Sequence, residues 1–170
     1  MGPLRAEVRA ASWFAALGEP LTDGDLADAR AYSGRDQIVP VTSWPEAETI
    51  LKSSDQGALA WWDKEERLRK ELLATAEAKF PERALWTALT ELTTEVGDLV
   101  HGKAATAANR MGGAQKASIH VAAGAAATSV YQLAVARTAG EINSPFESKF
   151  RLFAAGRWPL GIAGSRLALF

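Results

Sequence analysis

Residues 114–139 place the strongest constraint on the fold of this chain. The segment is rich in alanine around its whole circumference and is followed by Gly140, a residue type that commonly ends helices. Small side chains on every side let neighbouring helices approach closely, so we predict a helix at the centre of the fold. The segment also carries His120, Ser129 and Gln132, and alanine transfers too weakly into lipid to hold a membrane span. We therefore expect a buried helix of a soluble protein, without a membrane partner.

Periodic apolar residues and helix-ending residues predict further helices on both sides of this segment. The clearest stripe, with spacings of four, three, four and three, is formed by Leu85, Leu89, Leu92, Val96 and Leu99. That helix follows Pro81 and ends near Gly102 or continues to Arg110. Capping residues, prolines and glycines bound the other helices, which we expect over residues 3–17, 25–32, 43–52, 54 or 55–79, and 144–155.

Two short segments are typical of β-strands, Ile38–Val41 and Ser165–Phe170. Pro40 confines the first to a sheet edge, and these two segments are the expected partners if a sheet forms. Residues 158–161 are expected to form a turn. Because no repeat or long linker interrupts the chain, residues 1–170 are predicted to form a single, mainly α domain. Its architecture is a helical bundle of about five or six helices around the alanine-rich helix, with one or two short C-terminal or edge strands.

Cysteine is absent from the chain, which excludes disulfides, thiolate metal sites and cysteine nucleophiles. A chain without cysteine also fits a reducing compartment. The apolar N-terminal stretch is interrupted by Arg5, Glu7 and Arg9, so it lacks the continuous core of a secretory signal. We expect a cytoplasmic protein with no cofactor and no metal.

The two signs of charge are distributed unevenly along the chain. Residues 1–98 hold eleven Lys and Arg against eighteen Asp and Glu, whereas residues 99–170 hold eight against two, and the formal net charge is −1. The second part is therefore a candidate surface for an anion. The acidic first part would repel nucleic acid, so we do not expect nucleic-acid binding.

The helix that ends at Lys79 shows acid-to-base pairs four residues apart, which are typical of a solvated face. These pairs are Asp63–Arg67, Glu65–Arg69 and Glu66–Lys70. The opposite, buried face is predicted to consist of Trp61, Trp62, Leu68, Leu72, Leu73, Ala76 and Phe80.

His120 and Tyr131 are the candidate catalytic residues, because they are the two large polar-tipped side chains on one face of the alanine-rich helix. Gly124 and Ala127 lie between them and would leave a groove. A separation of eleven residues corresponds to about 16 Å, so the two side chains cannot form a direct acid–base pair. Either they mark the two ends of an elongated pocket, or a neighbouring helix fills the groove.

His101 follows Glu91, Glu95 and Asp98 along one helix face, and such a stripe of carboxylates and imidazole could ligate a divalent metal or hold a general base. Bundle proteins with two metal ions usually carry a Glu-x-x-His motif on each of two helices, and this sequence has none. A solvated face is the alternative interpretation.

The C-terminal residues 146–166 interleave basic and aromatic side chains. Arg151, Arg157 and Trp158 are the candidate ligand-binding residues, because arginine beside aromatic rings binds phosphates, carboxylates and stacked bases. The alternative is ordinary amphipathicity, in which Phe146, Phe150 and Phe153 face the core while Lys149 and Arg151 point elsewhere.

No catalytic motif emerges, and the sequence supports two functional hypotheses. The first is a protein–protein interaction or self-association module, with a protein partner or a second copy of the chain. The alternative is a protein or enzyme that binds a small anionic ligand between the central helix, residues 114–139, and the basic, aromatic cap, residues 146–166.

Overall fold

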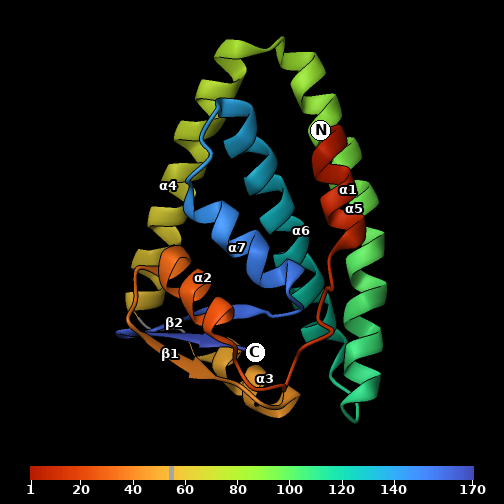
Figure 1. Cartoon of the computed structure of the whole chain (residues 1–170), viewed down its shortest axis with the longest axis vertical. Coiled ribbons are helices and arrows are strands. Elements are labelled where there is room, and N and C mark those ends of the chain that lie inside the picture. The colour runs from red at the N-terminus through yellow and green to blue at the C-terminus, as the bar shows by residue number, and fades with distance from the viewer. Residues whose placement is uncertain (54–55) are drawn as a thin grey trace.

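The computed structural model describes residues 1–53 and 56–170, which form a mainly helical domain with a small sheet (Figure 1). The described helices are α1 (Gly2–Ala10), α2 (Asp23–Ser33), α3 (Trp44–Lys52), α4 (Gln56–Lys79), α5 (Glu82–Arg110), α6 (Lys116–Ala139) and α7 (Pro145–Ala154). The strands are β1 (Gln37–Pro40), β2 (Pro159–Ala163) and β3 (Arg166–Leu169). The mainly α class is confirmed: the seven described helices correspond to the seven predicted segments, one more than the rounded estimate of five or six, and the described sheet has one strand more than expected. The predicted start of the fourth helix, Ser54 or Asp55, lies outside the described residues.

The alanine-rich helix α6 is the centre of the fold, as the sequence predicts. It packs against α5, α4 and α7, while α4 and α5 form two arms that meet near Phe80 (Figure 1). Ala122, Ala126 and Ala136 are fully buried, and their small side chains permit the close approach of several neighbours. The predicted apolar stripe of α5 is buried from Leu85 to Val96, and beyond it Val100 is buried while Leu99 is only partly buried.

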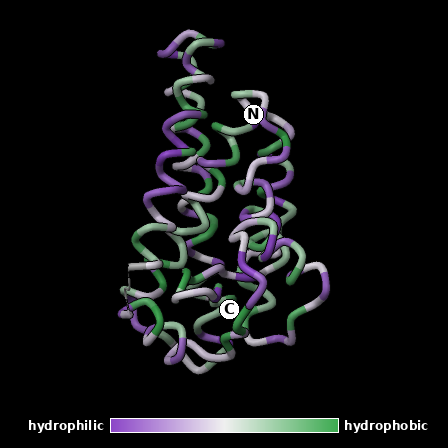
Figure 2. The backbone as a smooth tube through the Cα atoms, turned by 90° about the vertical axis from the view of Figure 1, so that its left-hand side faces the viewer, coloured by the Kyte–Doolittle hydropathy of each residue, from purple (hydrophilic) through white to green (hydrophobic). Residues whose placement is uncertain are grey.

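Although α6 is long and apolar enough by composition to cross a membrane, just over half of its most apolar window is buried inside the fold. Hydrophilic and hydrophobic residues are interspersed along the helices and form no continuous apolar belt (Figure 2). α6 is therefore mostly a buried helix of the fold.

Three strands form a small sheet in the order β1-β3-β2. The predicted partners do pair: β1 runs parallel to β3, with Ile38 opposite Leu167. The prediction of a turn over residues 158–161 is wrong, because Pro159 begins β2, which pairs antiparallel with β3. A register irregularity between Pro159 and Gly161 interrupts the alternation by which a strand is recognised in sequence.

The first helix ends at Ala10 rather than at residue 17. Phe14 lies in the left-handed region, with φ of 58°, and is fully buried against Phe153 and Trp158. Burial of this large ring against the aromatic cap outweighs the helical tendency of the segment. Gly156 lets the two chain segments approach, because a Cβ there would lie 2.7 Å from the Ala16 nitrogen.

Candidate functional site

Three adjoining cavities lie along α4, and all three are lined by Glu65. Their volumes are about 320, 350 and 410 Å³, within the range of small-molecule sites. We call them together the α4 cleft, and separately its first, second and third cavity. Besides α4, their walls come from α2, α3, α6, α7 and β2, so residues distant in sequence meet there.

A buried Lys149–Glu65 ion pair lies at the junction of these cavities. Lys149, on α7, also donates to the Gln132 side-chain oxygen at 3.0 Å, and its Nζ lies 5.4 Å from the centre of the Tyr32 ring. The Tyr32 hydroxyl donates to the same Glu65 oxygen at 3.5 Å. Four helices, α2, α4, α6 and α7, thus each contribute one polar side chain to a single buried network. Such a network rigidifies its surroundings when every member is satisfied.

Electrostatics hold both titratable donors of this network in their protonated forms. Burial of Lys149 acts to lower its pKa, but the nearby Tyr32 and Glu65 oxygens outweigh burial and raise the pKa above the usual lysine value. Burial raises the pKa of Tyr32. Lys149 therefore remains a cation and Tyr32 a neutral phenol at physiological pH. Neither side chain is activated as a nucleophile or a base, so the network provides a fixed ion pair and not a reactive group.

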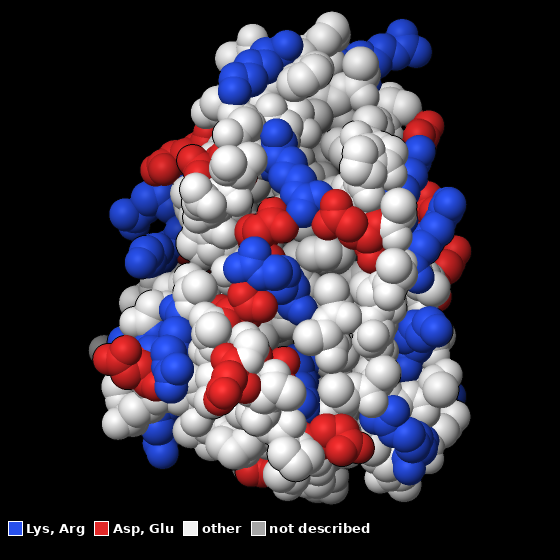
Figure 3. All heavy atoms as spheres, in the orientation of Figure 1, with Lys and Arg blue, Asp and Glu red and all other residues white. Residues whose placement is uncertain are grey.

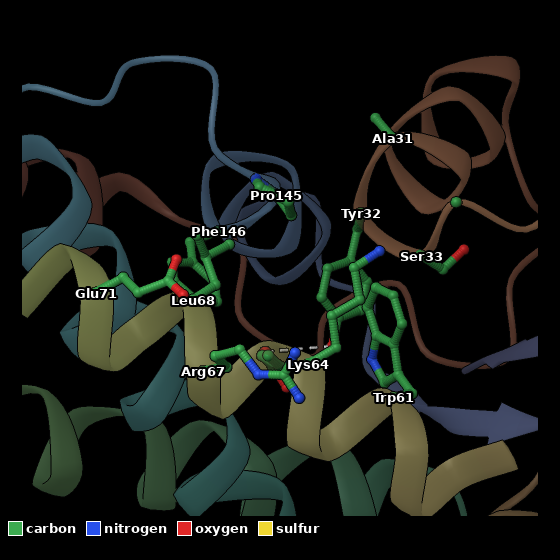
Figure 4. A pocket seen from close by; sticks show the side chains of 12 residues that line it. Ala31, Tyr32, Ser33, Trp61, Lys64, Arg67, Leu68, Glu71, Pro145 and Phe146 are labelled. Carbon is green, nitrogen blue, oxygen red and sulfur yellow. Dashed lines mark hydrogen bonds between the residues drawn. The ribbon is translucent and has the colours of Figure 1, made fainter.

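The first cavity combines an apolar floor with a cationic side (Figure 4). Lys64 and Arg67 are exposed, and neither has an ion-pair partner among the described residues, although Lys64 Nζ lies 5.5 Å from the centre of the Trp61 ring. In Figure 4 these two cations lie between Leu68 on one side and Trp61 on the other. The floor is formed by Tyr32, Trp61, Leu68, Pro145 and Phe146.

Tyr131, a sequence candidate, lines the third cavity together with Lys149 and Gln132. Its hydroxyl accepts a hydrogen bond from Arg69 Nη1 at 3.3 Å. Arg69 also forms two parallel hydrogen bonds with Glu66, of 2.6 and 2.7 Å, and these lower the pKa of the Glu66 carboxyl. Both cations of this cavity, Arg69 and Lys149, are thus already paired, in contrast to Lys64 and Arg67 of the first cavity.

Beside the second cavity lies an exposed apolar patch, which we define as Leu59, Trp62 and Val121. Trp62 is 61% exposed and Leu59 59% exposed. The prediction that Trp62 and Phe80 belong to the buried face of α4 is therefore wrong, because α6 and the sheet cover only one side of this helix.

His120, the other sequence candidate, does not line any of the three cavities of the cleft. It is exposed on α6 and packs against His101 of α5, with the ring centres 4.8 Å apart. The structure therefore separates His120 from Tyr131, and the proposed elongated pocket between them is not among the cavities described.

Arg157 is buried, and its guanidinium is saturated by protein acceptors. Its Nε donates to Asp25 at 3.0 Å, and its two terminal nitrogens donate to the backbone oxygens of Ala16, Glu19 and Pro20 at 2.5 to 2.7 Å. We call this arrangement the Arg157 clasp, because it fastens the N-terminal segment to the end of α7. A guanidinium with its donors used in this way stabilises the fold and has little capacity left for a ligand.

The other two candidates of the C-terminal cap also have partners within the protein. Trp158 is buried against Phe14, Trp44 and Phe170. Arg151 is exposed and pairs with Asp28 at 2.7 Å.

The two residues at the junction of the cleft, Glu65 and Lys149, escaped the sequence analysis. Glu65 was assigned to a solvated pair with Arg69, but Arg69 pairs with Glu66 and Glu65 is turned inward. Lys149 was expected to point away from the core and is only 7% exposed. A signal was present: each charge occupies a position in an apolar stripe, Glu65 four residues after Trp61 and Lys149 four before Phe153. Opposite charges at such positions of two helices indicate a buried pair.

Two of the three carboxylates that share a helix face with His101 form ion pairs elsewhere, and Glu91 pairs with Arg5 at 3.4 Å. Glu95 pairs with Arg9 at 2.5 Å and with Arg5 at 3.3 Å. Within residues 1–53 and 56–170, no group of three or more potential metal ligands comes together.

The uneven charge distribution of the sequence is largely resolved by pairing within the fold. Cations of residues 99–170 meet acids of residues 1–98 in four ion pairs: Arg137–Glu7, Lys149–Glu65, Arg151–Asp28 and Arg157–Asp25. Accordingly, the face seen in Figure 3 shows both signs interspersed.

No known protein family, curated protein or solved structure matches the chain significantly. The residues of the chain itself are therefore the basis for any proposal of its function.

Proposed function

We propose that this protein binds a small molecule in the α4 cleft, and that this ligand joins an anionic group to an apolar or aromatic body. The observation that carries the proposal is the first cavity, where Lys64 and Arg67, which have no ion-pair partner in the described part of the chain, lie beside an apolar floor. Ligand sites typically have this composition, mostly apolar walls with a few polar groups that fix orientation.

Each part of the cavity supports one part of the expected ligand. Arg67 offers a planar set of donors that matches a carboxylate or phosphate, and Lys64 adds a second positive charge. Trp61 offers aromatic surface for a ring, and Leu68 offers aliphatic surface for a hydrocarbon chain. Two acids line the cavity: Glu65 is neutralised by Lys149 behind it, and Glu71 lies beyond Leu68, on the side away from Lys64 and Trp61 (Figure 4).

The proposal is tested by measuring thermal stabilisation and binding heats with a panel of aromatic carboxylates, nucleoside monophosphates and fatty acids. The neutral amide, nucleoside or alcohol of each compound serves as its matched control. We expect an anionic member to raise the melting temperature and its neutral counterpart to have little effect.

Variants then locate the site. Arg67→Glu is expected to weaken binding by about tenfold or more, because it replaces an attraction with a repulsion of similar size. Lys70→Glu is the matched control, since Lys70 is exposed on the same helix but does not line the first cavity. Binding that is equally strong in Arg67→Glu and wild type would refute the assignment, as would a panel without any stabilising compound.

The apolar patch favours a second function, self-association through Leu59, Trp62 and Val121. Exposed tryptophans are frequent centres of protein interfaces, and the expected occupant is a second copy of this chain. A stable dimer buries about 800 Å² per partner, roughly a tenth of the 8658 Å² accessible surface of this chain. Sedimentation velocity over a range of concentrations should show dimers in the wild type and fewer in Trp62→Lys. A wild type that stays monomeric throughout would remove this second function.

We also propose a cytoplasmic location, which a cysteine-free chain fits. Nucleic-acid binding through residues 99–170 finds less support, because four of the cations there are paired with acids of the same chain. Gel-shift measurements at low salt would detect such binding if it occurred.

A further inference from the structure

We propose that His101 and His120 together bind a divalent transition-metal ion, in a surface site independent of the α4 cleft. The two residues are the only histidines of the chain. They lie on different helices, α5 and α6, and the fold brings their rings to a centre-to-centre distance of 4.8 Å with an angle of 31° between the ring planes.

The ring separation matches what a shared metal ion requires. With metal–nitrogen bonds of about 2.0–2.1 Å and an angle at the metal of about 90–110°, two imidazole centres lie about 4.5–5.2 Å apart. The observed 4.8 Å lies within this interval. Both side chains are exposed, so their rings can rotate to point one nitrogen each at a common ion.

The backbone around the pair is already in place for chelation. α5 and α6 form the most extensive helix–helix contact of the fold, with Val100 and Ala104 buried on either side of His101. Little chain ordering would therefore accompany binding, and the second imidazole would act at a high effective concentration once the first has bound.

The donor set selects the class of metal. Imidazole nitrogen suits zinc, copper and nickel, whereas magnesium and calcium prefer oxygen ligands. Since no third His, Cys, Asp or Glu joins the group within the described residues, water would occupy the remaining coordination positions. We expect affinity to rise from cobalt to nickel to copper and to fall again at zinc.

The test is titration calorimetry of the tag-free, full-length chain with Zn²⁺ and Ni²⁺, with Mg²⁺ as the control ion. One ion per chain is expected for zinc and nickel and no heat for magnesium. His101→Ala and His120→Ala should each weaken binding by about tenfold or more, because each turns a chelate into a single-ligand contact. Lys116→Ala, an exposed change one turn before His120, is the matched control and should bind as the wild type does.

A second measurement follows the ring protons directly. With two histidines in the chain, substoichiometric Ni²⁺ should broaden both sets of imidazole proton NMR signals together. The absence of binding heat would show that the rings merely stack, and retention of wild-type affinity in both single variants would place the ion elsewhere. Either result overturns the proposal. Circular dichroism of each variant confirms that the fold is intact, as expected for changes at exposed positions.

Discussion

The Arg157 clasp and the Lys149–Glu65 pair are both buried ion pairs of the C-terminal region, yet their surroundings differ. Arg157 meets Asp25 and three backbone oxygens. Lys149 meets Glu65 and Gln132, and cavities adjoin the pair. Replacing Arg157 would leave backbone oxygens without a donor, so this cation is part of the structural framework. Replacing both Lys149 and Glu65 by apolar residues would leave the backbone hydrogen bonds unchanged. The comparison separates a structural role for Arg157 from a role of Lys149 in shaping a site.

The largest effect is expected from Arg157→Ala. The change removes the partner of buried Asp25 and the donors to the Ala16, Glu19 and Pro20 oxygens. We expect a loss of about 4 kcal/mol in the free energy of unfolding, measured by urea denaturation. Arg157→Lys should recover only part of it, because lysine lacks the planar set of five donors. A loss below about 1 kcal/mol in Arg157→Ala would mean that water replaces the clasp.

Lys149→Met should destabilise by about 3 kcal/mol, because it leaves the Glu65 carboxylate buried without its cation. The double variant Lys149→Met/Glu65→Leu should recover most of this loss, since buried pairs are often replaceable by apolar side chains. Arg157→Met/Asp25→Leu should show no such recovery, because three backbone oxygens keep no donor and the Thr22 amide loses the Asp25 carboxylate that accepts from it. Equal recovery in the two double variants would abolish the distinction between the clasp and the cleft.

High pH sharpens the comparison further. Because the pKa of Lys149 is raised above 10.5 in the folded state, its contribution is fully present below that pH and is lost as pH rises through the folded-state pKa. Tyr32 acts in the same direction: its raised pKa means that above pH 10.0 the unfolded chain ionises first, which favours unfolding. The control is the triple variant Lys149→Met/Glu65→Leu/Tyr32→Phe, which lacks both titrating groups. Between pH 9 and 12 the free energy of unfolding should fall more steeply with pH in the wild type than in this variant. Parallel curves would contradict the raised pKa values.

The smallest effect is expected from Arg151→Ala. Its pair with Asp28 is partly solvent-exposed, with 49% of the Arg151 side chain accessible, so we expect a loss of less than about 1 kcal/mol, reduced further in 1 M salt. A loss above about 2 kcal/mol, comparable to that of Lys149→Met, would show that the stability contributions of these cations do not follow their burial.

Apolar periodicity and capping residues predicted most of the helices, because both depend on residues that are close together in the sequence. Thr22 begins α2 with a reciprocal capping box to Asp25, and Ser43 caps α3 through the Glu46 amide. The same information failed where packing overrides it, at Phe14, whose burial ends α1 early, and at Pro159, where pairing with β3 makes a strand.

The predicted site stays a prediction, but the structure shows how its residues and its location relate to the cavities. Cavities do lie between α6 and the C-terminal cap, and Tyr131 lines one of them. Arg151 and Arg157, however, are engaged within the fold, and Glu65 and Lys149 were assigned to solvent. Helical spacing defines a face but does not specify what lies opposite, so it could not distinguish a solvated charge from a buried pair.

The sequence by itself determined a mainly helical fold with the alanine-rich segment 114–139 at its centre, because apolar periodicity and side-chain size are local properties. Only the tertiary structure decided which charged side chains are buried and that the two histidine rings lie next to each other. Lys149 and Glu65 are 84 residues apart, and His101 and His120 lie on different helices. Their encounters depend on how α4, α5 and α7 pack around α6, which spacing along one helix does not specify.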